Sequence, residues 1–247
     1  MNRAHEARPL VSYDLVPPEP DEVLQTASAG SLMMANMALI KRPYIAAMAG
    51  ISSLAALAAL MIDFQFYATA TITGNSSADF FANFYIFLNA AALILQLFLA
   101  PMLQRRLGVG GVLMLLPFSL LGGAGVATWW TAVQTKAILR VTEGGVKAAL
   151  HRSTWEQTFL RISREKRAIA KVLVDGLSAR MSEGIGSTVL YVWLLLGAVP
   201  TALDDLHWIT WLLLVCLLGW LAITRYLQTL GCSTTQATDP VVRLPDT

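Results

Sequence analysis

The chain has 247 residues, of which 55% are hydrophobic and only 14% are charged, and its mean hydropathy is +0.57. Because a soluble domain typically carries about 25% charged residues, this composition excludes that class and indicates a polytopic membrane protein. The net charge of +2 says little by itself, and the two cysteines, Cys216 and Cys232, offer no disulfide or metal framework.

Residues 1–43 predict a cytoplasmic segment ahead of the first membrane span. Residues 1–23 are polar and contain prolines at positions 17, 18 and 20. Residues 24–40 are apolar but too short and too mixed to cross a bilayer comfortably, so we expect an interfacial helix there. Because no signal-peptide pattern is present, the first span is expected to serve as the insertion signal.

Six segments between residues 44 and 226 approach the length of about 20 residues that crosses a bilayer. They cover residues 44–69, 80–103, 109–128, 130–150, 172–199 and 208–226. The fourth is polar enough that hydropathy alone would miss it. The sequence therefore predicts an all-α bundle of six transmembrane helices, followed by a tail over residues 227–247.

The basic residues fix the orientation of this bundle. Of the 18 Lys and Arg residues, only Lys136, Arg140, Lys147 and Arg180 lie inside predicted spans, and all the others lie on one side. The charged residues on the opposite side are all acidic. By the positive-inside rule both termini are expected to be cytoplasmic, and we expect an integral protein of a bacterial inner membrane.

The loop over residues 151–171 is long, basic and amphipathic. Its Trp155, Phe159 and Ile162 recur at helical spacing. We expect this loop to lie on the cytoplasmic face of the membrane against anionic lipid.

Four charged residues of the fourth span share one face of a helix. At 100° per residue, Lys136, Arg140, Glu143 and Lys147 fall within a sector of about 60°. A charge at the centre of a membrane helix costs about 2.5–3.5 kcal/mol on insertion scales, so the face indicates a polar interior or a water-filled cavity that receives an anion. The alternative is an ion-pair ladder within the helix, since Glu143 is three residues from Arg140 and four from Lys147. One carboxylate cannot neutralise three cations, so the surplus needs partners on another helix, in water or in a ligand.

Other charged residues in predicted spans extend the candidate set. In the fifth span, Arg180 and Glu183 form a local pair, or Asp175 and Glu183 pair across to the fourth span. Asp63, near the outer end of the first span, either marks the interface or pairs with a cation of another span. The candidate ligand-binding residues are Lys136, Arg140 and Lys147, and the candidate charge-pairing or gating residues are Glu143, Asp63, Asp175, Arg180 and Glu183.

No soluble catalytic signature is present. The sequence has no Gly-rich phosphate loop, zinc-ligand spacing or nucleophile elbow, and its three histidines are scattered. We therefore expect no enzyme, no cofactor, no metal site and no nucleic-acid partner.

Four stretches, in this order, carry a resemblance to a known family. They are residues 63–66 (Asp-Phe-Gln-Phe), residues 79–85 with Asn89, residues 140–147 running into 151–156, and residues 170–176 with Arg180, Glu183, Gly184 and Gly186. Over about residues 41–225 the chain resembles the C-terminal six-helix half of the major-facilitator-type nucleotide (ATP/ADP) translocases and their bacterial relatives. It departs from that family at Tyr67, where a lysine is common, and at residues 159–162, which lack a proline.

The resemblance implies a transporter, or half of one, that moves a nucleotide or another phosphorylated anion by alternating access. Lys136, Arg140 and Lys147 would then meet phosphates, and Glu143 would hold these cations in place. Because a facilitator places its site between two halves, a homodimer or a separate partner subunit is expected. The alternative is a non-transporting membrane subunit that scaffolds or accompanies a larger complex.

Overall fold

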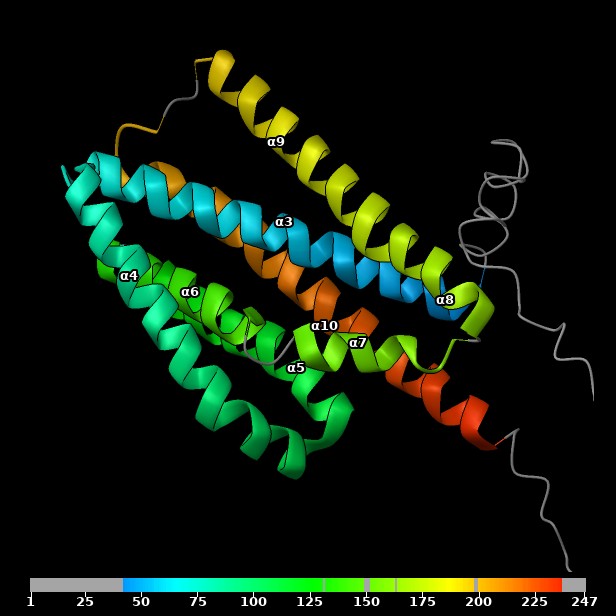
Figure 1. Cartoon of the computed structure of the whole chain (residues 1–247). Helices are drawn as coiled ribbons and strands as arrows, with labels where there is room; N and C mark the ends of the chain where they lie inside the picture. Colours follow the sequence, from blue (N-terminus) through cyan, green and yellow to red (C-terminus); the bar gives the residue numbers. More distant parts are fainter. Residues whose placement is uncertain (1–41, 131, 149–151, 163, 198–199, 237–247) are drawn as a thin grey trace, which may run out of the picture.

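The computed structural model describes residues 42–130, 132–148, 152–162, 164–197 and 200–236 (Figure 1). All regular elements in these ranges are helices, which confirms the all-α prediction. The predicted interfacial helix over residues 24–40 and the last part of the predicted tail lie outside the described residues.

The first half of the described chain forms four helices. They are α3 (Pro43–Ile72), α4 (Ala78–Ile94), which continues as the π-helical turn η1 (Leu95–Leu99), α5 (Ala100–Trp129) and α6 (Val133–Val146). The second half forms α7 (Arg152–Phe159), α8 (Arg164–Lys171), the π-helical segment η3 (Val172–Ser178), α9 (Ala179–Leu195), the short 3-10 turn η4 (Leu203–Leu206) and α10 (His207–Gln236). Helix α10 therefore runs past residue 226, where the sequence predicted its end.

Four helical segments are long and apolar enough to cross a membrane. They are Pro43–Ile72, Ala78–Leu99, Gly110–Trp129 and Leu203–Leu230. These segments overlap the first, second, third and sixth predicted spans. Their number and length indicate an integral membrane protein.

The fourth and fifth predicted spans are not confirmed as membrane-crossing helices. Helix α6 has 14 residues, a length of about 21 Å, which is shorter than the hydrocarbon core of about 30 Å. The helical run from α8 through η3 to α9 is longer, but it carries Lys171, Asp175, Arg180 and Glu183. Helix α6 begins at Val133, three residues later than predicted, and α9 ends at Leu195, four residues earlier than predicted.

A single glycine reverses the chain between the second and third spans. Gly108 interrupts α5 with φ 64° and ψ −179°, a backbone conformation that glycine adopts without a steric penalty. The segment with Arg105 and Arg106 is helical up to this glycine. The reversal therefore depends on Gly108.

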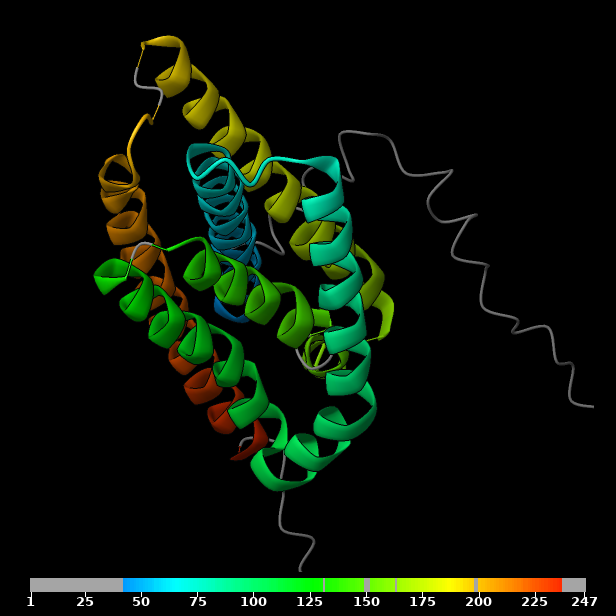
Figure 2. The ribbon, with the colours of Figure 1, turned by 90° about the vertical axis from the view of Figure 1, so that its left-hand side faces the viewer.

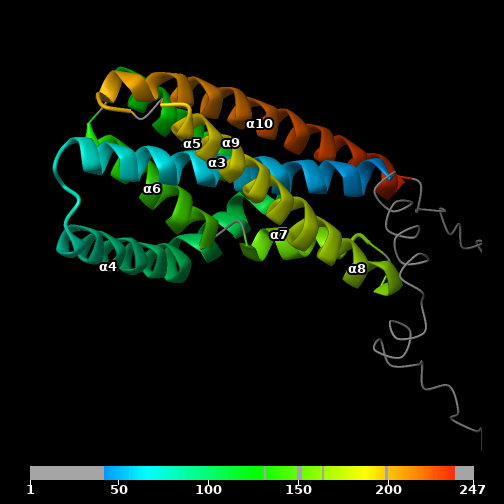
Figure 3. The ribbon, with the colours of Figure 1, turned by 90° about the horizontal axis from the view of Figure 1, so that it is seen from above.

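Helix α3 lies in the middle of the bundle, with α9 on one side of it and α4 on the other (Figures 1 and 2). Helices α6, α9 and α10 pack against α3, and α5 packs against both α6 and α10 (Figure 3). The apolar core lies where α3, α5 and α10 meet, around the fully buried Met48, Leu120 and Trp220. Helix α9 has no fully buried residue and α4 has only one, so these two helices form the open flanks of the bundle.

Glycine allows α9 to approach α3 closely. A Cβ atom at Gly186 would lie 2.8 Å from Cδ2 of both Leu57 and Leu60, whereas a Cβ atom at Gly184 would meet nothing within 4 Å. The contact between α9 and α3 therefore depends on the missing side chain at position 186.

We expect Gly186→Val to lower the free energy of unfolding by about 1–3 kcal/mol, because the added methyl groups would force α9 away from α3. Gly184→Val is the matched control, since it makes the same substitution in the same helix where space is free. Thermal melting of the purified protein in detergent measures both. Equal losses in the two variants would contradict this packing.

Candidate functional site

Helix α6 lies among α3, α4 and α5. Its Gly144 and Gly145 face α4, where added Cβ atoms would lie 3.4 Å from the side chain of Leu88 and 3.2 Å from that of Leu95. Small residues therefore hold α6 close to α4. Another face of α6 carries the four charged residues, and two of them, Lys136 and Arg140, contact α3.

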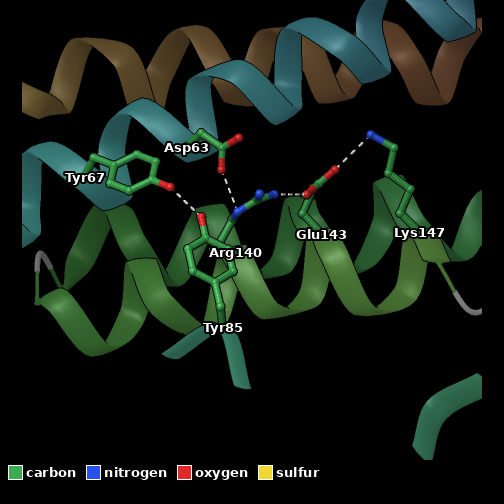
Figure 4. A network of polar contacts seen from close by, with 6 residues as sticks. All are labelled: Asp63, Tyr67, Tyr85, Arg140, Glu143 and Lys147. Carbon is green, nitrogen blue, oxygen red and sulfur yellow. Dashed lines mark hydrogen bonds and ion pairs between the residues drawn. The ribbon is translucent and has the colours of Figure 1, made fainter. Parts of the chain in front are cut away.

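The central part of this charged face is a network of ion pairs (Figure 4). Nε of Arg140 lies 2.5 Å from Oδ1 of Asp63 on α3, and the same guanidinium pairs with Oε2 of Glu143. Nζ of Lys147 lies 3.0 Å from Oε1 of Glu143. The predicted ladder within the helix is present, and Asp63 supplies the second carboxylate from another helix.

Two tyrosines lie beside Arg140 at the edge of the network. The hydroxyl groups of Tyr67 on α3 and Tyr85 on α4 are hydrogen-bonded to each other (Figure 4). Tyr85 also interacts electrostatically with Arg140. This tyrosine pair was not predictable from the sequence, because nothing in the spacing of residues 67 and 85 relates the two side chains.

Lys136 lies apart from these ion pairs. Its side chain is 1% exposed, and its Nζ donates to Oε1 of Gln65 at 2.5 Å and to Oγ1 of Thr210 at 3.1 Å. Thr210 in turn donates to the same oxygen of Gln65 at 3.0 Å. Within the described ranges, no carboxylate pairs with Lys136. This ammonium therefore links α6 to α3 and α10 through neutral oxygens.

Lys147 lines a pocket of about 530 Å³. Its walls come from α3, the end of α6, α7, α8, η3 and α9. The charged residues that line it are Lys147, Glu156, Lys171, Asp175 and Glu183. Of the candidate residues, Lys147, Asp175 and Glu183 thus share one pocket, whereas Lys136, Arg140, Asp63 and Arg180 do not line it.

The charged groups around the pocket have local partners. Nζ of Lys171 lies 2.6 Å from Oε1 of Glu156, and Arg180 pairs with Glu183 at 2.8 Å. Asp175 accepts a hydrogen bond of 2.7 Å from Nε1 of Trp155. Of the two alternatives for the fifth predicted span, the local Arg180–Glu183 pair is therefore the observed one.

Helix α7 packs against the bundle with aromatic side chains. Trp155 and Phe159 are 7% and 1% exposed, and their rings meet edge to face with centroids 5.8 Å apart. The sequence placed these residues on the lipid surface. The helical spacing was predicted correctly, but its apolar side packs on the protein core and holds the indole N–H against Asp175.

The carboxylates of α6 and α9 lie at similar depths along their helices. At 1.5 Å per residue, Glu143 is about 15 Å from Val133, where α6 begins, and Glu183 is about 18 Å from Leu195, where α9 ends. Both distances are close to half of a hydrocarbon core of about 30 Å. The residues of α3 that line the pocket, Ser52, Ala55 and Ala56, lie 10 to 14 residues into that 30-residue helix.

In the part of the chain that the structure describes, no group of three or more His, Cys, Asp or Glu residues is placed to hold a metal ion. Comparisons with protein-family models, curated proteins and solved structures found no match for this chain. The resemblance to nucleotide translocases stays a prediction from the sequence, and the function is argued from the site.

We expect Asp63 and Arg140 to be energetically coupled. In a double-mutant cycle of Asp63→Asn and Arg140→Gln, the coupling should be about 1–2 kcal/mol, because both side chains are largely withdrawn from solvent. The matched control is Arg180→Gln with Glu183→Gln, an exposed pair expected to couple by less than about 0.5 kcal/mol. Melting in detergent provides the energies, and similar coupling in both cycles would refute the difference in environment.

We expect the hydrogen bond between Lys136 and Gln65 to contribute to the stability of the fold. Gln65→Leu removes an oxygen from a buried ammonium and should lower stability by about 1–3 kcal/mol. The same substitution in a Lys136→Met background should cost much less, since no charge is then left without its acceptor. Thermal unfolding of the two single variants and the double variant tests this, and an equal cost in both backgrounds would exclude the contact.

Proposed function

We propose that the chain is a membrane transporter, or half of one, that moves an anionic solute through the pocket beside Lys147. The observation that carries this proposal is the pocket itself: charged side chains from the end of α6 and from α7, α8, η3 and α9 line a volume of about 530 Å³. Charged groups in membrane proteins usually face a bundle interior or a water-filled cavity and mark a solute pathway.

The exposed charged side chains indicate that this side of the bundle meets water or another protein. The side chains of Lys147 and Glu183 are 42% and 43% exposed, and that of Arg180 is 80% exposed. Hydrocarbon solvates such groups poorly, so water or another protein must meet this side of the bundle. In the proposed assembly a second copy of the chain, or a separate partner subunit, provides the opposite wall.

Lys147 is the proposed contact for the solute. Among the residues that the structure describes, its flexible ammonium pairs with Glu143 alone, and Glu143 has a second partner in Arg140. An anion in the pocket can therefore take over Lys147 without leaving Glu143 unpaired. In this proposal Arg140 and Asp63 hold the network and Lys136 anchors α6, whereas the resemblance suggested that Lys136 and Arg140 meet phosphates directly.

The proposed assembly keeps six helices in the membrane. Helix α6 and the run from η3 to α9 would complete the half-facilitator arrangement that the sequence resembles, with α3 and α6 facing the solute. Both termini would lie on the cytoplasmic side of the inner membrane, where the basic residues gather. Alternating access then requires movement of this half against its partner.

A second candidate function is a non-transporting membrane subunit that scaffolds or accompanies a larger complex. Its supporting observation is that Arg140, Lys147, Lys171 and Arg180 each have a carboxylate partner within the chain. A network that neutralises itself requires no solute.

Uptake into proteoliposomes tests the first candidate, with labelled ATP as the first probe and inorganic phosphate as the second. Lys147→Gln should reduce uptake about tenfold or more, which corresponds to a loss of about 1.4 kcal/mol in binding. Arg106→Gln removes an exposed charge far from the pocket and is the matched control. If uptake by the wild type and by Lys147→Gln does not exceed that of empty vesicles, the result would contradict transport and favour the non-transporting subunit.

Purification in mild detergent separates the two candidates further. A transporter half should migrate as a dimer or with one partner and should melt at higher temperature with the anion present. Co-migration with unrelated subunits and no anion-dependent shift would favour the scaffold.

A further inference from the structure

A second, smaller crevice lies at the opposite end of α3 from the Tyr67–Tyr85 pair. Its volume is about 250 Å³. The residues that line it come from α3 (Tyr44), the start of the third span (Gly110 and Leu113), the end of α7 (Thr158), the segment after it (Arg161), and the last part of the candidate span in α10 (Leu227 and Gln228).

The position of this crevice matches the level of lipid headgroups. Three of the candidate membrane helices begin or end beside it, at Pro43, Gly110 and Leu230. Tyr44, Gly110 and Gln228 therefore lie within one turn of these three ends. In a bilayer, the ends of apolar helices meet the headgroup region, and tyrosine is enriched at that level.

The polar groups of the crevice are held in fixed positions. The hydroxyl of Tyr44 donates to the carbonyl oxygen of Thr158 at 2.9 Å, and Nε2 of Gln228 donates to the carbonyl oxygen of Gly110 at 2.7 Å. A Cβ atom at Gly110 would lie 3.2 Å from this nitrogen. The glycine thus makes room for the glutamine side chain at the edge of the crevice.

Arg161 brings a cation to the crevice. Its guanidinium interacts electrostatically with Tyr44 and makes no ion pair among the described residues. Arg167 fixes the segment that carries it, because its side chain donates to the carbonyl oxygens of Phe159, Leu160 and Ile162 at 3.1–3.3 Å. The end of α7 is thereby capped, and Arg161 is left available to a ligand.

We propose that this crevice binds an anionic membrane phospholipid, with its phosphate on Arg161 and its glycerol and upper acyl chain against Leu113 and Leu227. A guanidinium pairs with phosphate oxygens through two parallel hydrogen bonds. Basic pockets between transmembrane helices on the basic side of a protein recognise such headgroups.

The apolar floor favours a lipid over free phosphate. Inorganic phosphate has no apolar surface to pack against Leu113 and Leu227, whereas a phospholipid carries its phosphate and its hydrocarbon in one molecule. The inference is independent of transport, since none of these residues lines the pocket beside Lys147. It also narrows the general expectation of lipid contact for the basic loop to one defined crevice.

The test uses the full chain purified in mild detergent and compares added phosphatidylglycerol, phosphatidylcholine and inorganic phosphate. We expect phosphatidylglycerol to raise the melting temperature and to remain bound in native mass spectrometry, and the other two to do neither. Arg161→Gln should weaken phosphatidylglycerol binding about tenfold. Arg164→Gln, which removes an exposed charge three residues away, should bind like the wild type.

The Arg161→Lys variant protects the test against misfolding, because it keeps the charge and should keep part of the affinity. Equal binding by the Arg161→Gln and Arg164→Gln variants would overturn the site, since general surface charge would then explain the lipid. A stability gain with inorganic phosphate that matches the gain with phosphatidylglycerol would overturn the lipid as its ligand.

Discussion

The rest of the structure depends on how the charged face of α6 is solvated by α3. Asp63 on α3 provides a carboxylate for Arg140, and Gln65, two residues further along, provides an oxygen for Lys136. Without these acceptors the α6 charges would be buried at a cost of several kcal/mol each. The central place of α3, between α6 and α10, follows from the contacts it makes with both. Apolar packing around Trp220 joins α10 and α5 to α3.

This constraint also divides the charged residues by role. Lys136 is enclosed by neutral oxygens and Arg140 by two carboxylates, so both are held by the fold. Lys147 lies one helical turn beyond Glu143 and reaches the pocket that α7, η3 and α9 complete. A gradient runs along one face of α6 from an enclosed ammonium to an accessible one. That gradient is the physical basis for placing a solute beside Lys147 rather than beside Lys136.

The sequence predicted the parts of this arrangement that depend on periodicity. The shared face of α6 and the ladder at Glu143 follow from spacing along one helix, and the four apolar spans follow from the length of their apolar runs. The partners of Lys136 were not predictable, because Gln65 and Thr210 are 71 and 74 residues away in the chain and uncharged acceptors leave no signal. The inward orientation of Trp155 was also missed, since an amphipathic helix at a membrane surface and one packed on a core have the same spacing.

The central claim is that α6 presents its charged face to a water-accessible pocket within the membrane. In a variant with Cys216 and Cys232 replaced, single cysteines at Ala148 and Ala179 would line the pocket, while one at Ile138 would lie on an exposed face of α6 outside it. The rate of reaction with a charged, hydrophilic thiol reagent in native membranes measures access to water. The account predicts rapid reaction at Ala148→Cys and Ala179→Cys and little at Ile138→Cys. Lack of reaction at both pocket positions, with the protein folded, would contradict it.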